Sequence, residues 1–263
     1  MTDILHLNII CLNDGTSKNE LQAADMKKFW KILLAALVFV LLASNIFFIV
    51  HDGYLDKFLF RYAGKERSNV PPNDEATTGW RESLEQLDYD ADIAFFGDSI
   101  TSMGHWQEWF PEKKIINLGI SANSLQDMEE RIGMVYSVKP EKVFIMGGVN
   151  GVTKGNIDPY VRRYASIVSK LQENLPGVKI YVQSVLPVSP GMEKHYNMSN
   201  DAMRRFNEAL RKICEEKGCV FVDLFPLYEK DGVMNPDLTS DGVHLVEGAY
   251  EPWIEAIRPY VEE

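Results

Sequence analysis

The chain has 263 residues and a formal net charge of −11 at pH 7. This length accommodates one domain of ordinary size together with an additional segment. The acidic charge argues against a nucleic-acid-binding protein, because such a protein needs a basic face for the phosphates. The three cysteines and five histidines form no cluster with zinc spacing, so no zinc site is expected.

An apolar segment dominates the N-terminal part of the chain. Residues 29–50 contain one lysine, one serine and one asparagine. Their number suits a helix that spans a bilayer, which needs about 20 residues. The segment lacks an A-x-A-like cleavage site, which favours a transmembrane signal-anchor over a cleaved signal peptide. We therefore expect a membrane-anchored protein, and a secreted one if the segment is cleaved.

The charges beside this segment predict its orientation. Three lysines, Lys27, Lys28 and Lys31, lie close to its N-terminal side. Asp52 and Asp56 are the first charged residues after it, although basic residues follow soon afterwards. The count of positive charges alone therefore does not decide the orientation, but proximity favours an N-terminus inside the cell. We expect the large C-terminal domain to be extracytoplasmic, either periplasmic or extracellular.

Composition divides the chain into four predicted segments. The four segments are a tail at 1–28, the signal-anchor at 29–50, a juxtamembrane linker at 51–88 and a folded domain at 89–263. Residues of the tail can precede a natural start at Met26. The linker contains turn formers and a proline pair.

Five short apolar runs alternate with amphipathic stretches in the folded domain, at 92–97, 114–119, 142–148, 179–187 and 219–226. The pair Ser124 and Asp127 is a helix-capping signal, and Gly218 is a helix stop. Cys214 and Cys219 flank a predicted turn, where buried thiols are favoured over a disulfide. The alternation predicts βαβ units, and hence a three-layer α/β/α domain with a parallel sheet.

Ser99 follows the first predicted strand in the sequence "FFGDSIT" at 95–101. We expect it at the start of a helix that also contains His105, where backbone N–H groups favour a developing negative charge. Thr101 stands where the G-x-S-x-G motif has its second glycine, so the stretch is not that motif. A serine nucleophile needs a base, and the base needs an orienting group. His244 and Asp241 in "SDGVHL" suit these roles, and a surface turn is the alternative.

Four separate blocks resemble, in order, the SGNH (GDSL-type) hydrolase family across residues 91–262. They are "FFGDSIT", "INLGISANS" at 116–124, "GGVNG" at 147–151 and "SDGVHL" at 240–245. The resemblance implies a flavodoxin-like fold and ester hydrolysis by a triad of Ser99, His244 and Asp241. It also implies an oxyanion hole made by the backbone N–H groups of Ser99 and Ala122 and the side-chain amide of Asn150.

The second and third blocks depart from the family pattern. Ala122 stands where the family usually has the oxyanion glycine, while Gly119 matches the earlier glycine of the block. An alanine N–H serves equally well if a residue with a Cβ can adopt the local φ. Gly151 replaces an acid or asparagine at a position peripheral to the chemistry.

Four further side chains receive predicted roles. Asp98 and Asn117 are expected to be structural and to accept backbone N–H bonds in their loops. Thr101 and Trp106 are candidates for substrate contact, Trp106 by stacking on a sugar. For Trp106, and equally for Trp109 and Trp253, packing in the core is the alternative.

The resemblance leaves four functions open. We favour a carbohydrate O-acetylesterase, because the domain is acidic and lacks a long apolar lid. A lysophospholipase or thioesterase acting on lipids and an O-acyltransferase with the same triad are the enzymatic alternatives. A binding module is disfavoured by the intact set of catalytic residue types. The expected partners are a small ester or acylated carbohydrate and, through the N-terminal helix, a membrane; no nucleic acid is expected.

Overall fold

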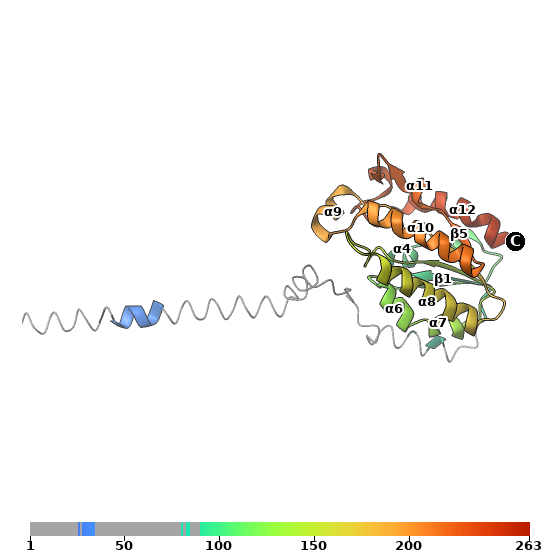
Figure 1. The fold of residues 1–263 in the computed structure, drawn as a ribbon, viewed down its shortest axis with the longest axis horizontal. Coiled ribbons are helices and arrows are strands. Elements are labelled where there is room, and N and C mark those ends of the chain that lie inside the picture. Colours follow the sequence, from blue (N-terminus) through green and yellow to red (C-terminus); the bar gives the residue numbers. More distant parts are fainter. Residues whose placement is uncertain (1–25, 27, 35–79, 81–82, 85–89) are drawn as a thin grey trace, which may run out of the picture. The chain divides into compact units, whose positions relative to one another are not determined.

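The computed structural model describes residues 26, 28–34, 80, 83–84 and 90–263 (Figure 1). The chain divides into two compact units, residues 1–65 and 66–263. Residues 29–34 of the predicted membrane segment are helical, whereas residues 35–50 lie outside the described part, as do most of the tail and linker. No helix among the described residues has the length and apolar character that crossing a membrane requires. The four predicted segment boundaries stay predictions.

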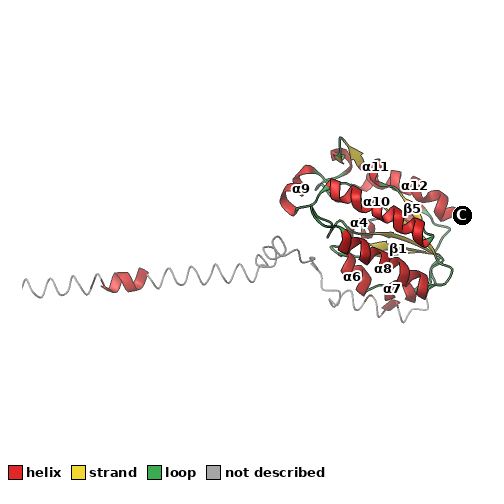
Figure 2. Cartoon of the chain, viewed as in Figure 1, coloured by secondary structure: helices red, strands yellow, loops and turns green. Residues whose placement is uncertain are grey.

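A five-stranded parallel sheet forms the centre of the second unit (Figures 1 and 2). The strands lie in the order β2–β1–β3–β4–β5, and each lies within one of the predicted apolar runs. Their bounds are β1 Ile93–Gly97, β2 Ile115–Gly119, β3 Lys142–Met146, β4 Lys179–Gln183 and β5 Val220–Val222. The strand order reverses between β1 and β3, so loops that leave in opposite directions open a crevice at the carboxyl ends of these strands.

Helices cover both faces of the sheet, which confirms the predicted three-layer arrangement. In one layer α8 packs against α6 and α10, and α7 is tied to α8 by a hydrogen bond from the Tyr136 hydroxyl to the Lys170 carbonyl. In the other layer α5 packs against α12 through Trp106 and Trp253. The bounds are α4 Ser99–Ser102, α5 Trp106–Trp109, α6 Leu125–Glu130, α7 Gly133–Ser137, α8 Asp158–Asn174, α10 Asn200–Lys217 and α12 Glu251–Glu262.

Short elements connect the last two strands to neighbouring helices. They are α9 Pro190–Tyr196, α11 Phe225–Tyr228, the β6–β7 hairpin of Glu229–Lys230 and Val233–Met234, and the 3-10 helices η1 Pro236–Leu238 and η2 Glu247–Tyr250. The predicted capping box of Ser124 and Asp127 begins α6, and Gly218 ends α10 with a φ of 69°. Cys214 and Cys219 are free thiols; Cys214 is buried as expected, whereas Cys219 is only partly buried.

A row of stacked aromatic rings crosses the sheet beneath α5. Phe95, Phe144 and Tyr181 occupy one register on β1, β3 and β4, with ring centroids 5.0 Å and 4.6 Å apart. Trp106 stacks on Phe95 at 4.2 Å, and Trp253 meets the indole edge-on at 5.1 Å. Trp106 is only 1% exposed, so its predicted role as a substrate platform is wrong, because both neighbouring rings hold it in the core.

The helix that Ser99 begins is shorter than expected and lies directly on the sheet. It ends at Ser102, and His105 instead precedes α5 with a side chain that is 70% exposed. A Cβ at Gly97 would lie 2.1 Å from Thr101 Oγ1, and one at Gly119 would lie 2.3 Å from the backbone nitrogen of Ser102. The two glycines therefore allow the close approach of α4.

This close approach gives a prediction with a matched control. Gly119→Ala places a methyl group against backbone, so we expect a loss of about 1–3 kcal/mol of stability and a large loss of ester hydrolysis. Gly133→Ala places the same methyl in open space in α7 and is expected to be neutral or slightly stabilising. Thermal unfolding and p-nitrophenyl acetate hydrolysis check both variants. Equal effects of the two substitutions would contradict the packing of α4 on Gly119.

Candidate active site

The three residues predicted as a triad form one hydrogen-bonded chain. His244 Nε2 lies 2.9 Å from Ser99 Oγ, and His244 Nδ1 lies 2.6 Å from Asp241 Oδ2. When Nδ1–H donates to the carboxylate, Nε2 is left to accept the serine proton. Ser99 is nearly buried at the end of β1, whereas His244 and Asp241 remain accessible at 31% and 47% of their side chains. The arrangement can therefore remove a proton from a serine that faces a solvent-accessible site.

Hydrogen bonds within the Asp241–His244 turn fix the position of the imidazole. Asp241 Oδ1 accepts from the backbone nitrogen of His244 at 2.8 Å, while Thr239 Oγ1 donates to the His244 carbonyl at 2.7 Å. The Gly242 carbonyl accepts from the backbone nitrogen of Ser189 at 2.9 Å, which ties the turn to the segment before α9. The position of the His244 imidazole is thus set by backbone hydrogen bonds of the turn as well as by its own bond to Asp241.

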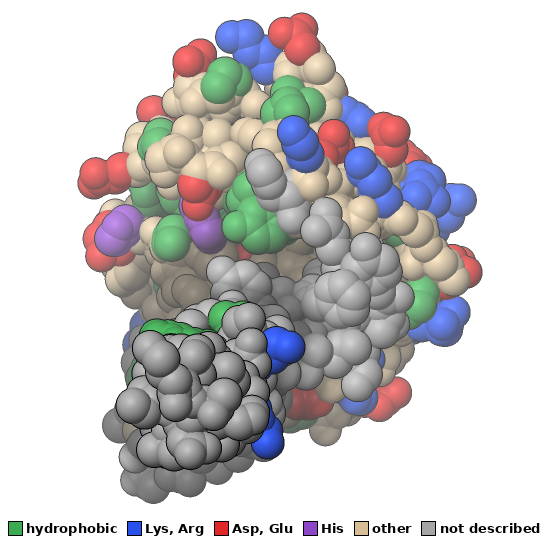
Figure 3. Space-filling model, turned by 90° about the vertical axis from the view of Figure 1, so that its left-hand side faces the viewer, with side chains coloured by type: hydrophobic (Ala, Val, Ile, Leu, Met, Phe, Trp, Pro, Cys, Tyr) green, Lys and Arg blue, Asp and Glu red, His purple; other side chains and the backbone are tan. Residues whose placement is uncertain are grey.

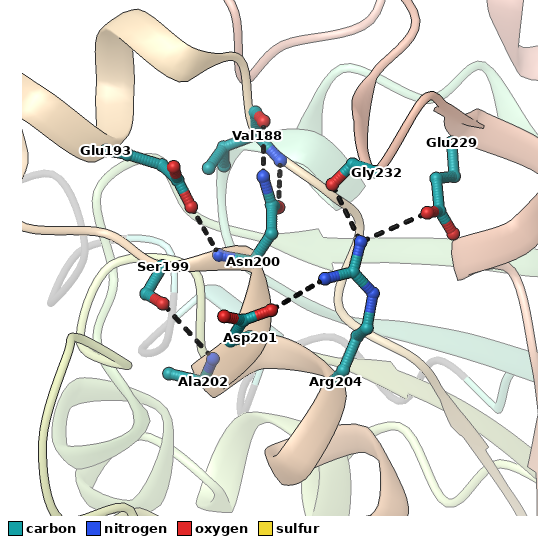
Figure 4. A network of polar contacts seen from close by, with 9 residues as sticks. All are labelled: Val188, Glu193, Ser199, Asn200, Asp201, Ala202, Arg204, Glu229 and Gly232. Atoms are coloured by element: carbon teal, nitrogen blue, oxygen red, sulfur yellow. Dashed lines mark hydrogen bonds and ion pairs between the residues drawn. The ribbon is translucent and has the colours of Figure 1, made fainter.

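A polar network at the start of α10 holds the segment beside this turn (Figure 4). Asn200 accepts from the Val188 nitrogen at 2.9 Å and donates to the Val188 carbonyl at 2.8 Å, like a paired strand residue. Arg204 reaches from the next turn to Glu229 at 3.0 Å and to the Gly232 carbonyl at 2.7 Å. The network thus links three parts of the fold: α10, the β6–β7 hairpin, and the segment at Val188 and Ser189 that binds the catalytic turn.

The electrostatics of Asp241 suit an orienting carboxylate. Desolvation acts to raise the pKa of Asp241, but the hydrogen bond from His244 and the backbone N–H bonds of Val243 and His244 outweigh it. Together they lower the pKa from 3.8 to about 2. The group therefore stays ionised at neutral pH and stabilises an imidazolium while the proton is on His244.

The residues expected to form an oxyanion hole come from three different loops. Ser99, Ala122 and Asn150 follow β1, β2 and β3, so they lie around the crevice where the strand order reverses. Ala122 has a φ of 62°, a left-handed conformation that costs a residue with a Cβ about 1–2 kcal/mol. Asn150 Nδ2 donates to the Asn123 carbonyl at 2.9 Å, and its amide carries a second N–H.

Arg131 links these loops, a role that no pattern in the sequence indicates. Its guanidinium is buried and donates to the Gly97 carbonyl at 2.7 Å, to the Leu118 carbonyl at 2.8 Å and to Asn123 Oδ1. It also lies over the Phe96 ring at 4.6 Å. One side chain therefore joins the ends of β1 and β2 to the loop that contains Ala122. The arginine follows a short helix with three acidic residues, and an arginine in such a position is usually exposed to solvent.

Asp98 is buried beside the nucleophile and has the predicted structural role. Its Oδ1 accepts from the Ile100 nitrogen at 3.0 Å and caps α4. Burial raises the pKa of Asp98 to about 6, against the opposing effects of the Ile100 hydrogen bond and the nearby His244 and Arg131 charges. Burial likewise lowers the pKa of Arg131 to about 9, which leaves it protonated at neutral pH. The charges of Asp98 and Arg131 stabilise each other electrostatically beneath the site.

Asn117 has the structural role expected for the second loop. Its Oδ1 accepts from the Gly119 nitrogen at 2.9 Å, and its Nδ2 donates to the carbonyls of Thr101, Ser102 and Gly104 at 3.1 Å each. Thr101 is fully buried under α4. The prediction that Thr101 contacts substrate is therefore wrong, because its hydroxyl faces the Gly97 backbone rather than the crevice.

Comparison with known proteins agrees with this geometry. A model of the GDSL-like lipase/acylhydrolase family matches residues 95–251. The chain belongs to this family. The predicted resemblance to SGNH hydrolases is thereby confirmed, and the family is one of carboxylic ester hydrolases. In the described part of the acylhydrolase no group of histidine, cysteine and acidic side chains could hold a metal ion.

Several known proteins are similar to this acylhydrolase. A multidomain esterase of Ruminococcus flavefaciens is 22% identical over 218 residues, which are 80% of this chain and 26% of that protein. The chain thus spans about a quarter of that relative's length. A Streptococcus pneumonia protein provisionally named a platelet activating factor is 22% identical, with a TM-score of 0.66 over 81% of this chain and 98% of that one. An acetyl xylan esterase is 23% identical, with a TM-score of 0.55 over 64% of this chain and 98% of that one. The solved structures share the fold.

The low pKa of Asp241 predicts how the stability of this acylhydrolase depends on pH. A carboxyl whose pKa falls from 3.8 to about 2 on folding stabilises the fold fully above pH 3.8 and loses that contribution as pH falls through 2. We expect the Tm of Asp241→Asn to lie below that of the wild type at pH 5, and the difference to shrink as pH approaches 2. Thermal unfolding at several pH values checks this, and a difference independent of pH would contradict it.

Proposed function

We propose that the chain is a serine esterase that removes short acyl groups, acetyl above all, from a carbohydrate through an acyl-enzyme. The observation that carries the proposal is the hydrogen-bonded chain from Asp241 through His244 to Ser99 at the carboxyl end of β1. The membership of an acylhydrolase family supports the reaction class. The similarity to an acetyl xylan esterase supports the choice of acyl group and alcohol.

The mechanism follows from the proton positions in the triad. His244 Nε2 takes the Ser99 proton as Oγ attacks the ester carbonyl, and Asp241 stabilises the imidazolium. The same proton passes to the leaving alcohol when the tetrahedral intermediate collapses to the acyl-enzyme. His244 then takes a proton from water, whose oxygen attacks the acyl group, and returns it to Ser99 Oγ.

The negative charge of each tetrahedral intermediate requires donors that are already in position. The proposed donors are the backbone N–H groups of Ser99 and Ala122 and the second N–H of the Asn150 amide. Loss of one such donor typically costs about 10²–10³ in rate. The bond from Asn150 to the Asn123 carbonyl supports this assignment, because it orients the amide beside the Ala122 loop.

The preference for a short acyl group rests on Ala122. Its methyl group stands on the loop that supplies a proposed oxyanion donor, where the family usually has only a hydrogen. A Cβ at this point narrows the space beside the carbonyl carbon. A hydrolase acting on long-chain lipids needs a wider acyl site, so the alanine favours the acetylesterase over the lysophospholipase.

An ester series tests both the reaction and the acyl preference. Ser99→Ala should lower kcat for p-nitrophenyl acetate by about 10⁴–10⁶-fold, since triad members act as a unit. The wild type should show a higher kcat/KM for acetyl than for octanoyl esters. Ala122→Gly keeps the N–H donor and should raise the butyryl-to-acetyl ratio of kcat/KM.

Two outcomes would overturn these parts of the proposal. Substantial turnover by folded Ser99→Ala protein would exclude Ser99 as the nucleophile. A wild-type preference for octanoyl over acetyl esters would make the lipid-directed hydrolase the better function. Transfer of the acyl group to an added sugar instead of water, seen by product analysis, would identify an acyltransferase.

The location proposed for the enzyme rests on the sequence alone. We propose a signal-anchor at residues 29–50 with the catalytic domain outside the cytoplasm, supported by the length and apolar composition of that segment. Protease added to intact cells should digest the C-terminal domain and spare the N-terminal tail. Recovery of the whole domain in the soluble cytosolic fraction would contradict the anchor, and a mature N-terminus near residue 45 would indicate cleavage instead.

A further inference from the structure

Two cysteines meet where α10 ends and β5, an edge strand of the sheet, begins. Cys214 lies in the last turn of α10, and Cys219 directly precedes Val220 at the start of β5. The Cys219 nitrogen donates to the Cys214 carbonyl at 3.1 Å. With standard bond lengths, this backbone bond keeps the two Cα atoms less than about 7 Å apart, the separation above which a disulfide needs backbone movement. The backbone therefore already permits a disulfide.

The two thiol groups also face each other. The Cys214 thiol is hydrogen-bonded to the Cys219 sulfur, and this bond raises the pKa of Cys214 while it lowers the pKa of Cys219. Cys214 is therefore the donor, and the sulfur of Cys219 is the acceptor that is stabilised as a thiolate. Side chains that point toward each other are the second geometric condition for a disulfide.

The two cysteines differ in exposure, which assigns them different roles in thiol–disulfide exchange. Cys214 is only 2% exposed, whereas Cys219 is partly exposed. The attacking group in such an exchange is a thiolate, and its pKa and access to solvent decide which cysteine reacts first. Cys219 meets both conditions, so it is the attacking sulfur. Cys214, buried and protonated beside it, is the sulfur that completes the exchange.

A local positive charge favours the thiolate of Cys219 in a protein that is acidic as a whole. Acidic and basic side chains are intermixed on the face of the protein in Figure 3, and the net charge is −11. Beside the thiols, however, the Lys217 ammonium further lowers the pKa of Cys219. Lys217 is held in place, because its ammonium donates to Ser169 Oγ at 2.6 Å and its carbonyl accepts from Gln172 at 2.7 Å.

We propose that Cys214 and Cys219 form a redox site, which a small external disulfide such as oxidised glutathione converts into a disulfide between α10 and β5. The Cys219 thiolate attacks one sulfur of the oxidant, forms a mixed disulfide and releases one glutathione thiolate. That thiolate takes the Cys214 proton, and the Cys214 sulfur then attacks Cys219 and releases the second glutathione, which is protonated by water. Two protein thiols are oxidised, and one external disulfide is reduced to two thiols.

The redox site lies at the opposite edge of the sheet from the triad. Cys219 precedes the amino end of β5, whereas Ser99 follows the carboxyl end of β1 in the same parallel sheet. Oxidation is therefore expected to leave the geometry of the triad unchanged. A crosslink between residues 214 and 219 restricts the unfolded chain, so its expected effect is on stability. The site is thus a property of the fold beyond the proposed esterase reaction.

The first test follows the thiols directly. The full-length protein with Cys11→Ser, which keeps only the two cysteines of the site, is incubated with oxidised glutathione, treated with iodoacetamide and analysed by mass spectrometry. We expect an intact mass lower by two hydrogen atoms, no carbamidomethyl group, and a crosslink within the peptide that contains both cysteines. Two carbamidomethylated cysteines after incubation with excess oxidised glutathione would overturn the proposal.

Single substitutions in the same protein test the two roles. Cys214→Ala leaves the attacking sulfur without a partner, so a stable glutathione adduct should accumulate on Cys219. Cys219→Ser leaves only the buried thiol, so Cys214 should form the adduct at least tenfold more slowly. Equal rates of adduct formation in the two variants, or faster formation on Cys214, would overturn the assignment of Cys219 as the attacking sulfur.

Thermal unfolding measures the consequence of the crosslink. The oxidised protein should unfold about 4–8 °C above the reduced protein, while the kcat for p-nitrophenyl acetate should be the same in both states. Cys219→Ser is the matched control, because it meets the same oxidant without forming the crosslink and should show no such shift. An oxidised protein with an unchanged or lower Tm would overturn the stabilising role of the disulfide. The thiol and Tm measurements do not depend on ester hydrolysis, so they are independent of the proposed function.

Discussion

The buried guanidinium of Arg131 is the contact on which the geometry of the site depends. It donates to the Gly97 and Leu118 carbonyls at the ends of two strands and to Asn123, the neighbour of Ala122. A planar fork of donors suits this task, because one rigid group satisfies acceptors on two strands and on the loop after β2. The left-handed Ala122 is strained for a residue with a Cβ, and such strain persists only where the surroundings hold it. Arg131 provides that restraint, and buried Asp98 compensates its charge.

Much of the fold could be read from the sequence, because its signals are local. Each apolar run holds a strand, and the capping box at Ser124 and the helix stop at Gly218 lie where predicted. Ser99, His244 and Asp241 meet as expected from their motifs. What the sequence could not give depends on tertiary packing. Gly97 and Gly119 lack a Cβ and therefore allow the short α4 to lie directly on the sheet. Thr101 and Trp106 are buried in this arrangement. No periodicity identifies Arg131, which follows two glutamates on a helix that otherwise resembles a solvated one.

The site combines two electrostatic environments that serve different steps. Beneath Ser99 the carboxyl of Asp98 is buried with a raised pKa, and it caps α4 by accepting from the Ile100 nitrogen. Above it, Asp241 is half exposed and stays ionised, because three hydrogen bonds favour its charged form. The two carboxyl groups therefore differ in environment, and only Asp241 is hydrogen-bonded to the catalytic base.

The central claim is that His244, oriented by Asp241, activates Ser99 as a nucleophile. Covalent labelling tests it most directly, because a fluorophosphonate reacts with a serine oxygen in proportion to its activation. After brief incubation of the full-length enzyme, peptide mass spectrometry should find the phosphonyl group on the peptide that contains Ser99, with loss of hydrolysis in step with labelling. His244→Ala should remove the label under the same conditions. A label on another serine, or full inactivation while Ser99 stays unmodified, would contradict the account.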